Sequence, residues 1–245
     1  MTDPFRLDGR RALVTGANTG IGQAIAVGLA RAGAAVTCAA RRAPDDTLAM
    51  IDAIGGTAEP LHLDLADPMA GAAALADGRH DILVNNAGII RRGDSVEFSE
   101  TDWDDVMDVN LKAVFFACQA FARALDGRPG AIVNVASLLS FQGGIRVPSY
   151  TAAKHGVAGI TKILANEWAA KGINVNAIAP GYVETNNTEA LRNDPDRSEA
   201  ILARIPAGRW GRAEDIAGAA VFLCTPAAAY VHGEVLTVDG GWMAR

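Results

Sequence analysis

The chain has 245 residues, 50% of them apolar, and its 22 basic and 28 acidic side chains give a formal net charge of −6. The length and apolar content predict one large domain with its own buried core, and the interspersed charges argue against a nucleic-acid partner. The charged N-terminus lacks the apolar core of a secretory signal, and no run of about 18 apolar residues could span a membrane, so we expect a cytoplasmic protein.

The residue types that bind metals are scattered along the sequence. Cys38, Cys118 and Cys224 lie far apart in apolar runs, without a CxxC pair or a neighbouring histidine cluster. Such cysteines are typical of buried thiols in a reducing compartment, and dispersed histidines do not form a zinc ligand set. The sequence therefore predicts no metal site.

The first elements in chain order form a β-α-β unit. The apolar run 11–15 predicts a strand, a glycine-rich turn follows it, and apolar residues at helical spacing predict a helix over 21–31. Gly33 ends that helix, and the apolar run 35–40 predicts a second buried strand.

The same alternation continues along the chain. Further strands are predicted at 59–63, 82–85, 131–135, 174–178 and 235–238, and further helices at 68–76, 103–125, 150–170 and 214–223. Strands that alternate with helices indicate the α/β class, here a single-domain, doubly wound parallel sheet (Rossmann fold) over 1–245 with helices on both faces. The polar segment 182–212 departs from this alternation, and its length predicts a substrate-binding lid.

The turn at 15–22 is the first stretch that points to chemistry. It places three glycines where a strand passes into a helix, so the backbone can approach a pyrophosphate closely at the helix N-terminus. By itself such a turn can also serve tight packing. The residues predicted to contact a cofactor here are Gly16, Asn18, Thr19, Gly20, Ile21 and Gly22.

A second group of residues follows the strand at 82–85. Asn86, Ala87 and Gly88 come at its carboxyl end, which faces the same crevice as the glycine turn in a parallel sheet. Short polar side chains and a glycine permit close contact with a ribose and adenine there.

A third group combines a helix with a strand end. Tyr150 and Lys154 are four residues apart and therefore share one face of a helix. Ser137 lies just beyond a strand that points toward them. The three side chains are our candidates for the reacting end of the site.

These motifs together resemble the short-chain dehydrogenase/reductase family. The shared features are TGxxxGIG at 15–22, NNAG at 85–88, Asn110, a serine thirteen positions before YxxxK at 150–154, and a Pro-Gly pair at 180–181. The match spans nearly the whole chain and implies a nicotinamide-dependent oxidoreductase. The further cofactor contacts that it implies are Asp64, Leu65, Pro180, Gly181, Val183, Thr185, Tyr150 and Lys154.

The resemblance also implies a role for each catalytic candidate. Tyr150 would exchange the proton, and because a tyrosine ordinarily titrates at about 10, a nearby Lys154 ammonium and an oxidised nicotinamide would favour its phenolate. Ser137 would donate a hydrogen bond to the substrate oxygen. Lys154 would also bind the nicotinamide ribose, and Asn110 would hold a water behind the lysine.

The end of the second predicted strand bears on the cofactor. An acidic side chain there would bond a ribose 2′-hydroxyl, and a basic one would accommodate a 2′-phosphate. This chain has Ala40 followed by Arg41 and Arg42, which favours NADP. The alternative is that both arginines are solvated surface residues and NAD is used.

Five segments, at 85–92, 140–150, 179–182, 185–188 and 204–211, resemble the family members that act on sugar acids of the 2-deoxy-D-gluconate or 2-dehydro-3-deoxy-D-gluconate type. A sugar acid needs a cation for its carboxylate and amide or hydroxyl groups for its hydroxyls. The candidates are Gln142, Arg146, Arg92, Asn186 and Asn187, with Arg146 as the first candidate for the carboxylate and a surface arginine as its alternative role.

Other functions remain open from the sequence. A gluconate 5-dehydrogenase and a 3-oxoacyl-carrier-protein reductase would share every catalytic residue, and a non-catalytic cofactor-binding protein would keep the fold. The intact serine, tyrosine and lysine argue against the last of these. The resemblance also implies a homotetramer, and we expect no nucleic-acid or membrane partner.

Overall fold

The computed structural model describes residues 3–245 and contains one parallel sheet. Its strands within this range are β1 (Arg11–Thr15), β2 (Ala35–Ala40), β3 (Ala58–His62), β4 (Ile82–Asn85), β5 (Gly130–Val135), β6 (Ile173–Pro180) and β7 (Val235–Val238). They lie in the order β3-β2-β1-β4-β5-β6-β7, so the chain crosses from one half of the sheet to the other between β3 and β4. This order brings the carboxyl ends of β1 and β4 together, where open sheets of this kind bind ligands.

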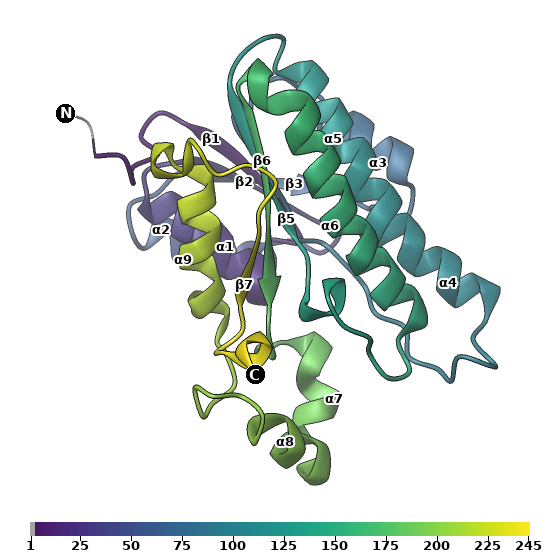
Figure 1. Cartoon of the computed structure of the whole chain (residues 1–245). Coiled ribbons are helices and arrows are strands. Elements are labelled where there is room, and N and C mark those ends of the chain that lie inside the picture. The colour runs from purple at the N-terminus through teal and green to yellow at the C-terminus, as the bar shows by residue number, and fades with distance from the viewer. Residues whose placement is uncertain (1–2) are drawn as a thin grey trace.

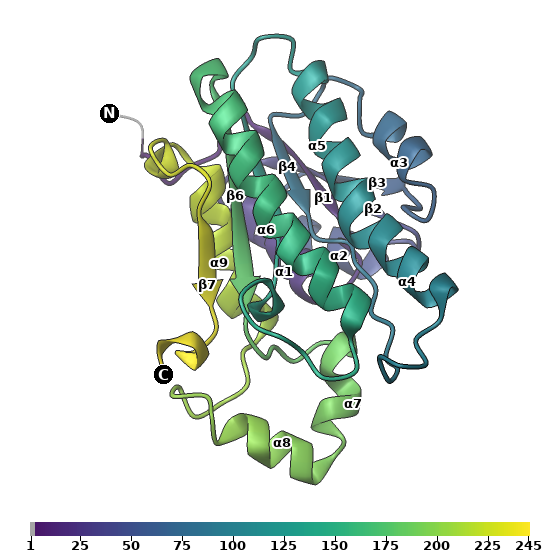
Figure 2. The ribbon, with the colours of Figure 1, turned by 45° about the vertical axis from the view of Figure 1, so that its right-hand side comes forward.

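Helices cover both faces of the sheet, as Figures 1 and 2 show. The helices within the described chain are α1 (Gly20–Arg31), α2 (Asp45–Asp52), α3 (Pro68–Ala74), α4 (Glu100–Met107), α5 (Ala113–Ala124), α6 (Pro148–Trp168), α7 (Glu189–Arg192), α8 (Pro195–Leu202) and α9 (Ala213–Cys224). One core joins α1 and α9 to the sheet through side chains such as Leu29 and Leu223. The other joins α5 and α6 through side chains such as Phe121 and Leu164. The predicted doubly wound α/β fold is confirmed.

The structure departs from the predicted elements in three places, and one is the presence of α7 and α8 in the segment 182–212, where no helix is predicted. Helix α2 was not predicted, because only Thr47 and Ile51 of its residues are buried and its apolar periodicity is correspondingly weak. The single helix predicted over 103–125 is wrong as a continuous element: α4 and α5 are separated by a π-helical turn at Asp108–Lys112. Such turns are inserted by tertiary contacts rather than by local propensity, and they occur frequently at functional sites.

The segment 182–212 lies beyond the carboxyl edge of the sheet and includes α7 and α8 (Figure 1). Its two ends are joined, because the Gly211 backbone donates to the carbonyl of Tyr182 and accepts from Glu184, both at 2.8 Å. The Tyr182 ring packs on Trp210 and Trp242, with centroids 5.6 and 4.7 Å away. The segment therefore packs, through Ile201, Ile205 and Trp210, on Leu138 and Trp242, which lie outside it. Within residues 3–245, no helix is both long and apolar enough to cross a membrane.

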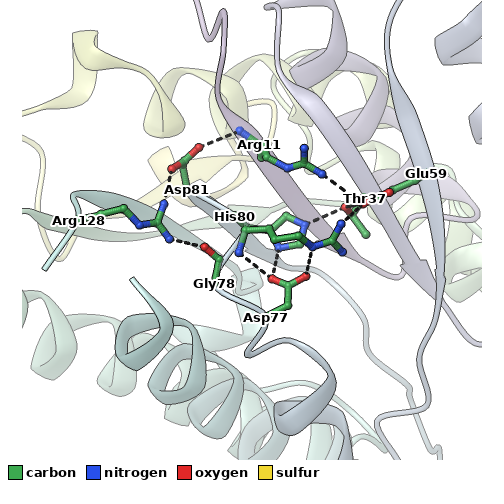
Figure 3. Close-up of polar contacts among 9 residues, drawn as sticks. Arg11, Thr37, Glu59, Asp77, Gly78, His80, Asp81 and Arg128 are labelled. Atoms are coloured by element: carbon green, nitrogen blue, oxygen red, sulfur yellow. Dashed lines mark hydrogen bonds and ion pairs between the residues drawn. The ribbon is translucent and has the colours of Figure 1, made fainter. Parts of the chain in front are cut away.

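A polar cluster joins β1, β2 and β3 to the turn that precedes β4 (Figure 3). His80 is 3% exposed, and its Nδ1 and Nε2 lie 3.0 Å from Asp77 Oδ1 and 2.8 Å from Thr37 Oγ1. Asp81 accepts the backbone N–H of Arg11 at 3.0 Å and Arg128 Nη1 at 3.1 Å. The cluster therefore ties together strands that are distant in sequence.

We expect His80 to make stability depend on pH. Burial lowers the pKa of His80 below its ordinary value, although Asp77 opposes this. The unfolded chain therefore binds more protons than the folded chain below about pH 6.5, and the free energy of unfolding falls as pH falls through this range. Urea denaturation at pH 7 and pH 5 should show a smaller decrease for His80→Gln than for the wild type. Equal decreases would contradict this role.

Candidate active site

The turn between β1 and α1 is held by backbone contacts that require glycine. Gly16 and Gly20 have φ of 66° and 58°, in the left-handed region that side chains disfavour. A Cβ at Gly22 would collide with the Gly16 carbonyl and the Asn86 side chain. The backbone at the N-terminus of α1 is thus left open for a pyrophosphate, as the sequence predicts.

The NNAG segment is bonded directly to this turn. Asn86 Nδ2 donates to the Thr15 carbonyl at 2.9 Å, and Thr15 Oγ1 accepts the N–H groups of Asn86 and Ala87, both at 3.0 Å. From the other side, Thr47 Oγ1 donates to the Ala17 carbonyl at 2.7 Å. Thr15 is the first residue of the TGxxxGIG motif but was not named among the predicted contacts, and Thr47 was not predicted, because no sequence signal marks it and its partner lies on another element.

A cavity of about 630 Å³ opens at the carboxyl ends of the strands and extends from the glycine turn to Tyr150. The predicted cofactor contacts that line it are Gly16, Asn18, Thr19, Gly20, Ile21, Gly22, Arg41, Arg42, Asp64, Leu65, Asn86, Ala87, Gly88, Pro180, Gly181, Val183 and Thr185. Ser137, Tyr150, Lys154, Asn186 and Asn187 line it as well. Asn110, Arg92, Gln142 and Arg146 do not. One space is therefore shared by the predicted cofactor contacts and the predicted reacting groups.

Lys154 is buried and fixed at the floor of this cavity. Its Nζ donates to the Val135 carbonyl at 2.6 Å and lies 5.4 Å from the centroid of the Tyr150 ring. Burial lowers the pKa of Lys154 to about 8. Burial also raises the pKa of the half-buried Tyr150, and the Ser137 hydroxyl and the Arg92 charge only partly oppose this rise. Without the positive charge of an oxidised nicotinamide, the Tyr150 phenol is therefore protonated at neutral pH.

Asn110 lies in the π-helical turn and is fully buried. Its Oδ1 accepts the N–H of Ile89 and its Nδ2 donates to the Ile89 carbonyl, both at 2.8 Å. The side chain therefore fixes the backbone just after Gly88. The predicted role of Asn110 in holding a water stays a prediction.

Of the predicted substrate residues, Asn186 and Asn187 line the cavity, whereas Gln142, Arg146 and Arg92 do not. Arg146 is exposed, with φ of 61°, and its carbonyl accepts the N–H of Gly93 at 3.1 Å. Gln142 Oε1 accepts from Trp242 Nε1 at 3.4 Å. Arg92 reaches the opposite rim, where its Nη2 donates to the Asn187 carbonyl at 2.8 Å. The positive charge of Arg92 also acts to lower the pKa of Tyr150, against the larger effect of burial.

Sequence reasoning missed several lining residues. They are Thr15, Ala39, Ala40, Leu63, Ala66, Ile89, Arg91, Asp105, Asp108, Val109, Val135, Ala136 and Thr188. Arg91 is held by Asp102 at 3.2 Å and Asp105 at 3.0 Å, so its charge is already paired. Within residues 3–245 no group of three or more His, Cys, Asp or Glu side chains could hold a metal ion.

A glycine turn that leaves room for a pyrophosphate, joined in one cavity to a tyrosine, a buried lysine and a serine, defines an oxidoreductase of the nicotinamide-dependent class. Residues 16–243 match the family model described as enoyl-(acyl carrier protein) reductase. The chain belongs to the short-chain dehydrogenase/reductase family.

Individual relatives are similar over nearly their whole lengths. The chain is 55% identical to a 2-dehydro-3-deoxy-D-gluconate 5-dehydrogenase of Dickeya dadantii, covering 98% of both chains. It is 74% identical to a putative 2-deoxy-D-gluconate 3-dehydrogenase of Agrobacterium tumefaciens solved with bound NADP, with a TM-score of 0.98 and 100% coverage of both chains. A putative NAD(P)-dependent gluconate 5-dehydrogenase of Beutenbergia cavernae, also solved with NADP, is 52% identical, with a TM-score of 0.95 and coverage of 99% of this chain and 100% of that one.

Proposed function

We propose that the chain is an NADP-dependent dehydrogenase that transfers a hydride between the nicotinamide and a hydroxyl or ketone of a sugar acid, of the 2-dehydro-3-deoxy-D-gluconate or 2-deoxy-D-gluconate type. The observation that carries this proposal is the single cavity that joins Arg41 and Arg42 at one end to Tyr150 and Lys154 at the other. The names of the similar proteins support both the cofactor and the substrate class.

Each residue of the reacting group has a distinct task in this proposal. When bound, NADP would supply the hydride acceptor for oxidation and its reduced form the hydride donor for reduction. During oxidation the Tyr150 phenolate takes the proton of the substrate hydroxyl, and during reduction the phenol returns it to the carbonyl oxygen. Ser137 donates a hydrogen bond to that oxygen while its charge develops. The Lys154 ammonium stabilises the phenolate and binds the nicotinamide ribose.

The preference for NADP depends on the residues that follow β2. The strand ends at Ala40, whose small side chain leaves room, and Arg41 and Arg42 are exposed at the edge of the cavity. Neither arginine forms an ion pair with another residue of the described range 3–245. Both guanidinium groups are therefore available to bind a 2′-phosphate.

The segment 182–212 acts as the lid in this proposal, and Arg92 links it to the opposite rim. The bond from Arg92 to the Asn187 carbonyl spans 95 positions of sequence. Because Arg92 also influences Tyr150 electrostatically, its guanidinium can bind a substrate carboxylate beside the reacting group. Asn186 and Asn187 would then bond the substrate hydroxyls.

Arg92→Ala is expected to raise the KM for the sugar acid by about tenfold or more, because a charge-assisted hydrogen bond contributes about 1.5 kcal/mol or more. Initial-rate kinetics at saturating NADP will measure it. Arg146→Ala is the matched control, since Arg92 bonds the Asn187 carbonyl and acts on Tyr150 whereas no such contact is formed by the Arg146 side chain within the described residues, and its KM should stay close to the wild-type value. The reverse result, a high KM for Arg146→Ala alone, would reinstate Arg146 as the carboxylate ligand.

The test of the function is a substrate panel. Purified protein is assayed with NADP and NAD against 2-dehydro-3-deoxy-D-gluconate, 2-deoxy-D-gluconate and D-gluconate, and with the reduced cofactors against a 3-oxoacyl thioester. We expect turnover of a sugar acid with NADP. Turnover of the acyl thioester alone would identify an acyl-carrier reductase instead, and no turnover of any substrate would favour a non-catalytic cofactor-binding protein. We further propose a homotetramer of the 25.4 kDa chain, which light scattering will test.

A further inference from the structure

Ser140 occupies a buried position between two parts of the reacting group. It ends the short helical turn Leu138–Ser140 that follows Ser137, and it is 7% exposed. Its Oγ donates to the backbone carbonyl of Lys154 at 2.6 Å. No motif of the family resemblance includes this serine, and it does not line the cavity.

The bond from Ser140 closes a ring of contacts around Lys154. The Ser140 N–H donates to the Ser137 carbonyl at 2.9 Å, and Lys154 Nζ donates to the Val135 carbonyl at 2.6 Å. Val135 and Ser137 belong to the same stretch of chain at the end of β5. Lys154 is thus attached to that stretch twice, through its backbone carbonyl by way of Ser140 and through its own ammonium.

The Ser140 bond is not needed to complete helix α6. Lys154 lies well inside α6, where each carbonyl already accepts the N–H four residues later. The hydroxyl therefore uses the second lone pair of the Lys154 carbonyl. Its effect is to fix the position of α6 against the turn that carries Ser137.

We propose that Ser140 is a positioning residue of the active site, which fixes Lys154 and Tyr150 on α6 relative to Ser137 without touching the substrate or the cofactor. The proposal rests on the proposed function, because it assumes that Tyr150, Lys154 and Ser137 act together on one substrate oxygen. A small displacement of α6 would move the ammonium away from the phenolate and separate the two groups that contact that oxygen.

Two serine-to-alanine variants test the proposal, and each removes the hydroxyl of one buried serine. Ser140→Ala deletes the bond to Lys154. Ser149→Ala is the control, because Ser149 is fully buried at the start of α6 and its Oγ has no hydrogen-bond partner within the described residues. Both variants are assayed at saturating sugar acid and NADP, and rates are expressed per folded protein, determined by circular dichroism and by titration of NADPH fluorescence.

We expect Ser140→Ala to lower kcat about tenfold, with the KM for NADP nearly unchanged, because misplaced catalytic groups affect the transition state rather than cofactor binding. The pH at half-maximal kcat for oxidation should rise by about half a unit, because the phenolate has lost part of its stabilisation by the ammonium. Ser149→Ala should match the wild type in both measurements. Ser140→Thr, which keeps the hydroxyl, should recover most of the lost kcat.

Equal kcat and equal pH profiles for the two alanine variants would overturn the proposal. So would a loss in Ser140→Ala that disappears when rates are expressed per folded protein, since that result would show a purely structural role. If Ser140→Ala does not fold, the result for Ser140→Thr is decisive. A Ser140→Thr variant that folds normally and keeps the hydroxyl, but whose kcat is tenfold lower than that of the wild type, would also contradict the proposal. A wild type inactive toward every sugar acid would instead refute the proposed function.

Discussion

Tyr150→Phe is expected to lower kcat by about a thousandfold, because the variant has no group at that position that can exchange a proton with the substrate oxygen. The change removes one hydroxyl and keeps the ring, which lies 5.4 Å from Lys154 Nζ. The glycine turn and Arg41 are untouched, so NADP affinity should be largely retained. Stopped-flow or steady-state measurement of NADPH formation from the sugar acid will give the rate, and fluorescence titration will give the affinity.

The control for Tyr150→Phe is a tyrosine elsewhere in the fold. Tyr230 is 99% exposed and does not line the cavity, so Tyr230→Phe should leave kcat unchanged. Activity of Tyr150→Phe within a factor of about ten of the wild type would mean that another group exchanges the proton, because general acid-base catalysis ordinarily contributes more than this. A loss of both kcat and NADP affinity would point to a structural effect instead.

The paired change Arg41→Ala with Arg42→Ala is expected to raise the KM for NADP about 100-fold, equivalent to about 2.7 kcal/mol, because two charge-assisted contacts with the 2′-phosphate are lost. The KM for NAD should change little, since NAD has a hydroxyl in that position. The ratio of kcat/KM for the two cofactors therefore shifts toward NAD. Initial rates with each cofactor at saturating sugar acid will measure the shift.

Arg31→Ala is a suitable control for this pair, because Arg31 is exposed in the last turn of α1 and does not line the cavity. It should leave both KM values unchanged. A wild type that prefers NAD by a large factor, or a double variant with an unaltered KM for NADP, would assign Arg41 and Arg42 to the solvated surface.

The parts of the fold that could be predicted are those whose signals are local. The alternation of apolar runs and helical periodicity predicts the doubly wound sheet, and the glycines of the 15–22 turn mark the junction of β1 and α1. The π-helical turn at Asp108–Lys112 could not be predicted, because its residues read as an uninterrupted helix and Asn110 meets its partner Ile89 only in the folded chain. Helix α2 was missed because a short helix with two buried residues leaves little periodicity.

The active site likewise has a part with local sequence signals and a part that depends on contacts between distant segments. The residues predicted to contact the cofactor lie in contiguous motifs, and in the structure they line one cavity. The substrate side is predicted to be built from loops that are far apart in sequence: Arg92 bonds the Asn187 carbonyl, while Arg146 adopts a left-handed backbone conformation, and neither arginine lines the cavity. Proximity in sequence to Tyr150 was the reason for naming Arg146 first, but the left-handed backbone at Arg146 precedes the start of α6 and depends on contacts that the sequence does not show.

The strand order also determines when the sheet can be completed during translation. β1, β2 and β3 leave the ribosome first and occupy neighbouring places in one half of the sheet. The other edge of β1 pairs with β4, whose residues 82–85 are made about 70 positions later. Until then the nascent chain exposes an unpaired, apolar central edge, which is a template for pairing with another chain. Slow elongation between β3 and β4 would prolong that exposure and favour aggregation of the nascent chain or its capture by chaperones.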